Sequence, residues 1–290
     1  MCHVGGVRSE VAAVSFPELM TLRSLGDERF AATGPRYPWG VLYGGQVIAQ
    51  ALRAAGQTVR ADECIHSLHA YYVRAGRDSE AIELDVARVR DGRSFSVRAV
   101  TARQGTAVIA TVLASFHIEE SGEVLPSAKA PAVATADELE SGGWTSLYDR
   151  RYAPVDEPAR TLAWVRLTDE LGPDQDLQAC ALVFTADDIF DDAVLALVHP
   201  GRPPANDLSE RDWSLSTQSL DYSVWFHRRI RSDGWRLHDF RCRALANACA
   251  TVVGEVFDHA GVHLATVAQQ MLVRRTVAAD DLYPGTPAAD

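Results

Sequence analysis

The stretch YGGQVIAQALRAAG, residues 43–56, decides the fold of this chain. Two glycines open a segment that has helical spacing, and between Val47 and Ala55 only Gln50 and Arg53 are polar. A surface helix shows one apolar stripe, whereas a helix that is apolar nearly all round is buried. The sequence therefore predicts a buried helix that other elements must wrap, with a pair of glycines at its entrance.

Four strand-like segments follow this helix. Residues 81–92 and 94–105 alternate apolar and polar side chains, which is the two-residue period of a half-buried strand. Residues 106–118 form a long apolar run that is typical of a central strand, and residues 64–76 mix apolar, aromatic and polar side chains before a glycine. Four such strands in succession can form an antiparallel sheet that wraps the helix.

The same order of elements recurs in the second half of the chain. It follows residues 119–143, which are rich in Pro, Ala, Ser and Glu and have the composition of a linker. Beyond the linker the pattern predicts a strand at 162–171, a helix at 188–200 that stops at proline, and then four strands. These four strands are expected at 218–230, 234–246, 248–261 and 262–275.

Short sequence matches between the two halves support an internal duplication, and such a repeat determines the architecture of a chain. Ser67-Leu68 in the first half recurs as Ser219-Leu220 in the second. Ala110-Thr111-Val112 recurs as Ala265-Thr266-Val267, at nearly the same separation along the chain. The two halves are therefore expected to repeat one structural unit.

Two sheet-wrapped helices in tandem predict an α+β fold of the double-hotdog type. In this fold the two units share one continuous antiparallel sheet, and both helices lie on its concave face. We expect the N-terminal hotdog at residues 15–118, a linker at 119–160 and the C-terminal hotdog at 161–276. A structureless loop as long as the stretch 119–143 is uncommon inside one compact domain, so a boundary between two units explains the linker better.

Composition limits the classes of function. The formal net charge of −11 argues against broad nucleic-acid binding, which needs a basic face. The five cysteines are scattered and odd in number, so they fit neither a zinc site nor a disulfide framework. No apolar run approaches the roughly 20 residues of a membrane span, and the first residues lack the features of a signal peptide. We therefore expect a cytoplasmic protein with no nucleic-acid partner and no stable membrane association.

Four segments in combination resemble the type II acyl-CoA thioesterase family, the TesB type. They are YGGQVIAQAL (43–52), HSLHAYYVRAG (66–76), VRDGRSFSVR (89–98) and YSVWFHR (222–228). The resemblance runs from about residue 36 to residue 275 and is weakest in the linker. It implies a double hotdog that hydrolyses acyl-CoA thioesters to a free fatty acid and CoA, with no metal and no covalent cofactor.

The resemblance also implies three catalytic residues in the C-terminal hotdog, which together orient a hydrolytic water. The family's Asp opens the second helix, and the run FTADDIF matches it with Asp187, or with Asp188 one place on. The hydroxyl falls on Ser219, where many relatives carry Thr; serine keeps the hydroxyl but loses the methyl that restricts the rotamer. The family's Gln falls on Gln269 rather than Gln270, although the two residues that follow Gln269 depart from the family's Glu-Gly.

These residue types suit thioester hydrolysis. A thioester carbonyl is already electrophilic, and holding water in attack geometry lowers the barrier further. Aspartate has a reference pKa of about 3.9, so base catalysis needs that pKa raised by burial or by neighbouring charge. The catalytic Asp, Ser and Gln align roughly with Gln46, Ser67 and Ala114 of the first half. The first half therefore lacks the carboxylate and the amide, which predicts one active site in each chain.

Seven further residues are expected to contact the substrate. The two glycines let the backbone approach a ligand, and the helix behind them can direct N–H groups at an oxyanion or a polarised carbonyl. Tight helix packing is the open alternative for the glycines, and a structural role is the alternative for the histidine. The arginines can meet CoA phosphates. The set is Gly44, Gly45, Gln46, His66, Tyr71, Arg74 and Arg228.

Other interpretations of the same residues remain open. The four aspartates between positions 187 and 192 can simply stabilise a helix start, by ~0.3–1 kcal/mol each. A non-catalytic acyl-CoA sensor and a hotdog enoyl-CoA hydratase would share the fold, but the hydratase would carry a His where this chain has Asp192. The G-x-S-x-G elbow of serine hydrolases is absent. Acyl-CoA is the expected substrate, and exposed sheet edges favour a homo-oligomer.

Overall fold

The computed structural model describes residues 14–123, 125, 128–206 and 214–275. No helix in these ranges is long and apolar enough to cross a membrane. The elements of the first half are α1 (Phe16–Leu19), β1 (Arg23–Gly26), β2 (Arg29–Ala32), α2 (Gly44–Gly56), β3 (Glu63–Tyr72), β4 (Ile82–Asp91), β5 (Phe95–Gln104) and β6 (Ala107–Ile118).

The second half begins with a short 3-10 turn, Ala136–Glu138, and then follows the order of the first half with α4 and β9 added. Its elements are β7 (Tyr148–Ala153), β8 (Arg160–Leu167), α3 (Gln175–Ala186), α4 (Ile189–Val198), β9 (Leu215–Ser219), β10 (Asp221–Phe226), β11 (Arg236–Ala246), β12 (Cys249–Asp258) and β13 (His263–Arg275).

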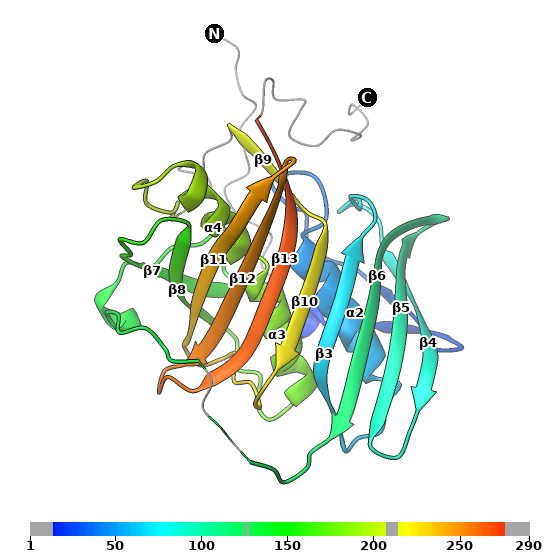
Figure 1. Ribbon diagram of the computed structural model, residues 1–290. Helices are drawn as coiled ribbons and strands as arrows, with labels where there is room; N and C mark the ends of the chain where they lie inside the picture. Colours follow the sequence, from blue (N-terminus) through cyan, green and yellow to red (C-terminus); the bar gives the residue numbers. More distant parts are fainter. Residues whose placement is uncertain (1–13, 124, 126–127, 207–213, 276–290) are drawn as a thin grey trace, which may run out of the picture.

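All thirteen strands described belong to one antiparallel sheet (Figure 1). Its order is β1-β2-β4-β5-β6-β3-β10-β13-β12-β11-β8-β7, and β9 pairs with β13 beside β10. The two halves meet where β3 pairs with β10. Outward from this seam, each half repeats the same sequence of strands, so the predicted double hotdog with one continuous sheet is confirmed.

The ladders define how the two halves correspond. Residues 70–72 of β3 pair with residues 110–112 of β6, and residues 224–226 of β10 pair with residues 265–267 of β13. Matching Ala110-Thr111-Val112 to Ala265-Thr266-Val267 then places Ala70 on Val224 in the seam strands. We call this mapping the ladder correspondence.

This register corrects one of the letter matches. Ala114 maps onto Gln269, as expected, but Ser67 maps onto Asp221, two positions beyond the expected Ser219. The two letter matches differ in their separation along the chain, and the hydrogen-bonded ladders do not allow both at once. The expected match of Gln46 to the catalytic Asp also fails, because Gln46 lies near the start of α2 and Asp187 follows the end of α3.

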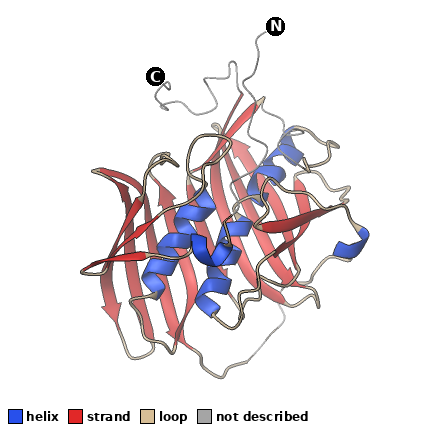
Figure 2. Cartoon of the chain, turned by 180° about the vertical axis from the view of Figure 1, so that it is seen from behind, coloured by secondary structure: helices blue, strands red, loops and turns tan. Residues whose placement is uncertain are grey.

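Helices α2, α3 and α4 cover one face of the sheet (Figure 2). Ten of the thirteen residues of α2 are buried, which confirms the helix expected from the opening stretch. Its polar Gln50 is fully buried and donates from Nε2 to the carbonyl oxygens of Leu19 and Thr33 at 2.8 and 2.9 Å. Burial of this amide therefore leaves no unpaired donor.

The second half differs from the prediction in its helices. A helix does lie within the predicted 188–200, namely α4, but the helix that packs along α2 is α3. All ten residues of α3 after its first two are buried, so no polar stripe marks its period in the sequence. Asp187 and Asp188 keep right-handed helical backbone between α3 and α4. Asp187 therefore ends a helix instead of opening one.

The stretch expected as a linker, 119–160, contains the edge strand β7 and the 3-10 turn. Ala130, Val133 and Leu139 pack on a separate apolar cluster that includes Trp164. The indole Nε1 of Trp164 donates to the carbonyl oxygen of Ala134 at 2.9 Å. Part of the linker is thus a strap that covers a face of the second half.

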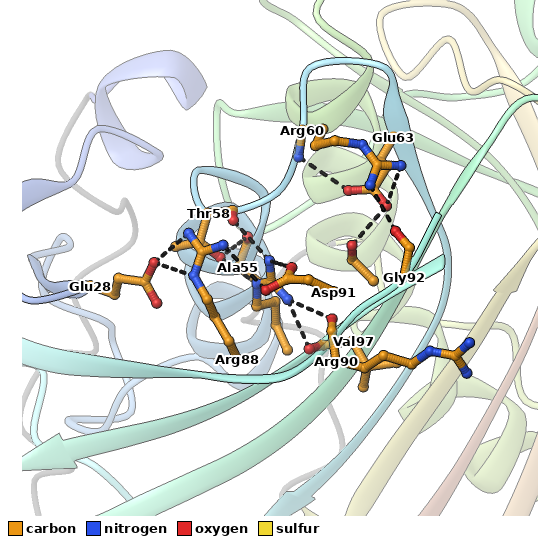
Figure 3. A network of polar contacts seen from close by, with 12 residues as sticks. Glu28, Ala55, Thr58, Arg60, Glu63, Arg88, Arg90, Asp91, Gly92 and Val97 are labelled. Carbon is orange, nitrogen blue, oxygen red and sulfur yellow. Dashed lines mark hydrogen bonds and ion pairs between the residues drawn. The ribbon is translucent and has the colours of Figure 1, made fainter. Parts of the chain in front are cut away.

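The motif VRDGRSFSVR forms a polar network at the end of α2 (Figure 3). The guanidinium of Arg98 is fully buried and donates to Thr58 Oγ1, to the Thr58 carbonyl and to the Arg90 carbonyl, each at 2.9 Å. Its ion pair with Asp91 and the bond from Thr58 Oγ1 to the Ala55 carbonyl complete the cluster. The motif therefore holds the C-terminal end of α2 against the β4–β5 hairpin.

Candidate active site

The carboxylate of Asp187 connects the two halves of the chain. Its Oδ2 accepts the backbone N–H of Gly45, in the first turn of α2, at 2.7 Å. Its Oδ1 accepts a hydrogen bond from Gln269 Nε2, on β13, at 2.7 Å. Two of the three residues expected to be catalytic are therefore in direct contact, and a backbone donor from the other half holds the same carboxylate.

The two glycines allow this close approach. A Cβ on Gly44 would lie 3.0 Å from both Asp187 Oδ2 and the Tyr72 hydroxyl. A Cβ on Gly45 would lie 2.7 Å from the carbonyl oxygen of Phe184 on α3. Gly45 is therefore needed for contact between the helices, whereas the missing side chain of Gly44 leaves space between two polar groups.

Burial raises the pKa of Asp187 to about 7. The hydrogen bonds from Gln269 and from the Gly45 backbone lower this pKa, while the negative charges of Asp191 and Asp188 raise it. A pKa near the operating pH is what general-base catalysis requires. The acidic cluster that could have been a simple helix cap thus contains a carboxylate suited to accepting a proton.

The neighbouring Asp188 is engaged elsewhere. Its carboxylate forms an ion pair with the buried Arg150 and accepts a hydrogen bond from the indole Nε1 of Trp144 at 2.7 Å. The carboxylate of Asp192 accepts the hydroxyl of Tyr152. Of the two candidates in FTADDIF, Asp187 is therefore the one that contacts Gln269.

A cavity of about 260 Å³ opens beside Asp187. Apolar side chains form much of its wall, among them Leu42, Val47 and Ile109. Ser219 lines the same cavity at the end of β9, so the structure places all three expected catalytic residues around this site, with Gln269 behind Asp187. Gln269 is 1% exposed, and its Oε1 is buried without a hydrogen-bond partner among the described residues.

Tyr72, and not the expected Tyr71, is the tyrosine of β3 that lines the cavity. Strand β3 alternates, so Ala70 and Tyr72 face the helices while His69 and Tyr71 face outward. The expected Tyr71 is 66% exposed and does not line the cavity, which corrects that assignment. The Tyr72 hydroxyl is buried, lines the cavity and has no hydrogen-bond partner among the described residues. The period of the strand was the signal that could have identified it.

The other residues expected to contact substrate separate into three groups. Gly44 and Arg74 line the cavity, and Gly45 donates to Asp187. Gln46 is fully buried, accepts the hydroxyl of Tyr37 and donates to Gln50 Oε1 at 3.2 Å. Gln46 therefore supports the loop before α2 and is not part of the cavity wall.

His66 and Arg228 lie at the other end of the β3–β10 seam, where they line a second cavity of about 170 Å³. The ring Nε2 of His66 is hydrogen-bonded to Ser115 Oγ at 2.8 Å. Burial and the nearby His117 lower the pKa of His66. His66 and Arg228 do not lie near Asp187, because they are at one end of the β3–β10 strand pair and Asp187 is at the other.

Comparison with known families and proteins agrees with this architecture. Residues 33–117 match the acyl-CoA thioesterase N-terminal domain, and residues 126–273 match the acyl-CoA thioesterase C-terminal domain. The chain is 27% identical over 281 residues to acyl-CoA thioesterase 2 of Haemophilus influenzae, with 88% of this chain and 96% of that protein covered. It is also 27% identical over 306 residues to human acyl-coenzyme A thioesterase 8, with 93% and 92% covered.

Solved structures give the same result. The acyl-CoA thioesterase II TesB2 of Mycobacterium marinum superimposes with a TM-score of 0.78 at 30% identity, covering 90% of this chain and 99% of that one. A hot dog fold protein of Alicyclobacillus acidocaldarius, at 19% identity and a TM-score of 0.74, shares the fold, with 90% of this chain and 98% of that one covered. With both domain models matched in order over most of its length, the chain belongs to the type II acyl-CoA thioesterase family.

Proposed function

We propose that this protein hydrolyses acyl-CoA thioesters to a carboxylic acid and CoA, with water oriented by Asp187, Ser219 and Gln269. The observation that carries the proposal is the state of Asp187. Its carboxylate is buried beside a cavity, both its oxygens are held by donors, and its pKa is raised to about 7. Family membership supplies the substrate class.

In the proposed reaction, the oxygen of the water forms a bond to the thioester carbonyl carbon. Asp187 takes one proton of the water as the bond forms. The unpartnered Oε1 of Gln269 accepts the other hydrogen of the water, and the hydroxyl of Ser219 donates to the water oxygen, which aims the water. When the tetrahedral intermediate collapses, the C–S bond breaks, the electron pair leaves with sulfur, and the proton held by Asp187 passes to the CoA thiolate.

The developing negative charge on the carbonyl oxygen needs donors. We assign this role to the Tyr72 hydroxyl and the N-terminal end of α2, where Tyr43 forms no side-chain cap. Burial and the charge of Asp187 raise the pKa of Tyr72 well above its usual value, so the phenol keeps its proton and can donate it in a hydrogen bond. The missing side chain of Gly44 leaves the space beside both groups.

A thiol-trapping assay across acyl chain lengths tests the proposal. The wild-type chain should release CoA, and Asp187→Asn should lose at least ~100-fold in kcat while its circular dichroism spectrum stays native-like and it still unfolds in one cooperative transition. Unchanged turnover in Asp187→Asn would refute the assignment of the base. Tight acyl-CoA binding by the wild-type chain without thiol release would indicate a sensor and not a hydrolase.

We propose that residues 161–276 supply the catalytic side chains and residues 15–118 the Gly45 donor, so that both hotdogs are needed for activity. We also propose a cytoplasmic homo-oligomer. Light scattering on the purified chain tests the assembly, and a mass equal to the 31.6 kDa of one chain would reject it.

A further inference from the structure

The second cavity is the counterpart of the catalytic cavity under the duplication. The catalytic cavity is lined by residues 72–76, at the end of β3, and by residues 217–220. The second cavity is lined by residues 226–230, at the end of β10, and by residues 64–66. The ladder correspondence carries 72–76 onto 226–230, and carries 64–66 onto 218–220.

The helices obey the same correspondence. Gly44 and Val47, in the first turn of α2, line the catalytic cavity, while Asp176 and Ala179, with the same spacing in α3, line the second cavity. A Cβ on Gly44 would meet the carboxylate that follows α3, and a Cβ on Gly56, at the end of α2, would lie 2.9 Å from Asp176 Oδ2. Each cavity therefore lies where the start of one helix faces the end of the other.

The second cavity has lost the groups proposed for hydrolysis. Ile65 occupies the place of Ser219, and Ala114 occupies the place of Gln269. At the end of α2, Ala55 and Gly56 occupy the positions that correspond to Asp187 and Asp188 at the end of α3. No water can be activated there in the manner proposed for Asp187, because all three polar side chains are missing.

One arginine occupies the same place in both cavities. Arg74 follows β3 and Arg228 follows β10, and the ladder correspondence carries the first onto the second. Among the described residues, none forms a hydrogen bond or an ion pair with the Arg228 guanidinium. A ligand anion that meets Arg74 in the catalytic cavity therefore has an equivalent partner in the second cavity.

The second cavity is also more basic than its counterpart. It adds the rings of His66, His117 and His227 and the guanidinium of Arg229, although burial lowers the pKa of His66 and of His227. Its acidic groups are Glu119, which forms an ion pair with Arg229 at 2.6 Å, and Asp176, whose pKa is raised by burial. The catalytic cavity, by contrast, is lined by Asp187, Asp188 and Asp191.

We infer that the second cavity is a non-hydrolytic binding site for a phosphate-bearing ligand of the coenzyme A class. The choice of ligand rests on the proposed function, because it assumes that the catalytic cavity accepts CoA and that its duplicate kept the anion contact after losing the hydrolytic residues. The ligand at this site is bound through Arg228 and is not cleaved.

Cys64 provides a local probe, because its half-buried thiol lines the second cavity and is absent from the catalytic one. The full-length protein is alkylated with N-ethylmaleimide at mildly alkaline pH, with and without desulfo-CoA, which has no thiol of its own. Labelling of Cys64 is followed by peptide mass spectrometry, with Cys249 of β12, which is also half-buried, as internal reference. At a ligand concentration four times its Kd, labelling of Cys64 alone should slow about fivefold.

Two arginine variants and inorganic phosphate test whether the protection of Cys64 depends on Arg228. Arg228→Ala should abolish the protection of Cys64, and Arg74→Ala, its equivalent in the catalytic cavity, should keep it. Equal protection of Cys64 and Cys249, or no protection, would overturn the inference. Protection by inorganic phosphate alone, at the concentration where desulfo-CoA acts, would overturn the CoA class in favour of a simple anion site.

Adenosine 3′,5′-bisphosphate tests whether the nucleotide end of CoA is sufficient for binding. Protection of Cys64 by this compound supports recognition through the phosphates. If desulfo-CoA protects Cys64 and this compound does not, binding through Arg228 is overturned. The Asp187→Asn variant separates this inference from the proposed function. Protection that persists in this variant supports the second site whatever happens to turnover. Hydrolysis by the wild-type chain without protection of Cys64 would leave the proposed function intact and reject the second site.

Discussion

Asp187 Oδ2 accepts the backbone N–H of Gly45, a residue 142 positions earlier, at 2.7 Å. The carboxylate follows the second long helix and the donor lies in the first turn of the first one. The candidate active site is therefore completed only where the two hotdogs meet. This relationship explains why a glycine pair opens α2: the backbone itself must reach the carboxylate.

Gln269 and Gln270 form a matched pair for testing the amide. Gln269→Ala should lower kcat by ~100-fold or more, because the water loses an aiming group and Asp187 loses a donor. Removing that donor should also raise the pKa of Asp187, so the pH at which activity is half-maximal should move upward. Gln270→Ala, which changes an exposed side chain, should leave kcat within about twofold. Equal losses in both variants would argue against the assignment of Gln269.

The pH dependence of activity follows from the raised pKa of Asp187. The base must be ionised, so kcat/KM should increase about tenfold per pH unit below about pH 7 and level off above it. Steady-state kinetics in a constant-ionic-strength buffer series measure the profile. A plateau that begins near pH 4 would show that burial does not perturb this carboxylate.

The free energy of unfolding should fall as pH rises, whereas the activity should increase. The pKa of Asp187 is raised from 3.8 to about 7, so between these values the folded chain keeps a proton that the unfolded chain has lost. The free energy of unfolding should fall as pH rises from about 4 to about 7, by up to about 4 kcal/mol at about 1.4 kcal/mol per pKa unit. Asp187→Asn stays neutral and should lack this contribution. Urea unfolding of both proteins at pH 5 and pH 8 isolates it, since Asp192, also raised to about 7, is common to both.

Tyr72 and Tyr71 form a second matched pair. Tyr72→Phe removes only a buried hydroxyl that has no partner among the described residues, so stability should be unchanged or slightly increased. If this hydroxyl donates to the thioester oxygen, kcat should fall by about 10- to 100-fold. Tyr71→Phe, on the exposed face, should change neither quantity. A Tyr72→Phe enzyme with wild-type kcat would remove this residue from the oxyanion site.

The two glycines should respond differently to alanine. In Gly45→Ala the new Cβ would lie 2.7 Å from a backbone oxygen of α3, so we expect a loss of about 1–3 kcal/mol in the free energy of unfolding. In Gly44→Ala the Cβ would lie between Asp187 Oδ2 and the Tyr72 hydroxyl, so activity should fall more than stability. Thermal unfolding and kcat/KM of both variants test the contrast, and the reverse pattern would contradict the site geometry.

The sequence by itself determined the elements whose signal is local. The period of two in the strands and the nearly all-apolar α2 placed these elements within a few residues of their bounds, and their repeated order predicted the double hotdog. The resemblance indicated Asp187, Ser219 and Gln269; the first two line one cavity, and Gln269 is hydrogen-bonded to Asp187 behind it. Their catalytic roles stay predictions.

Tertiary structure decided what depends on register between distant segments. Helix α3 is buried on all sides, so its sequence carries no amphipathic period, and only its packing against α2 identifies it as the second central helix. His66 and Arg228 were expected to contact the substrate, but the antiparallel β3–β10 seam places them at the opposite end from Asp187. A motif read along the chain does not say at which end of a ladder it will lie, because hydrogen bonds between strands far apart in sequence decide that.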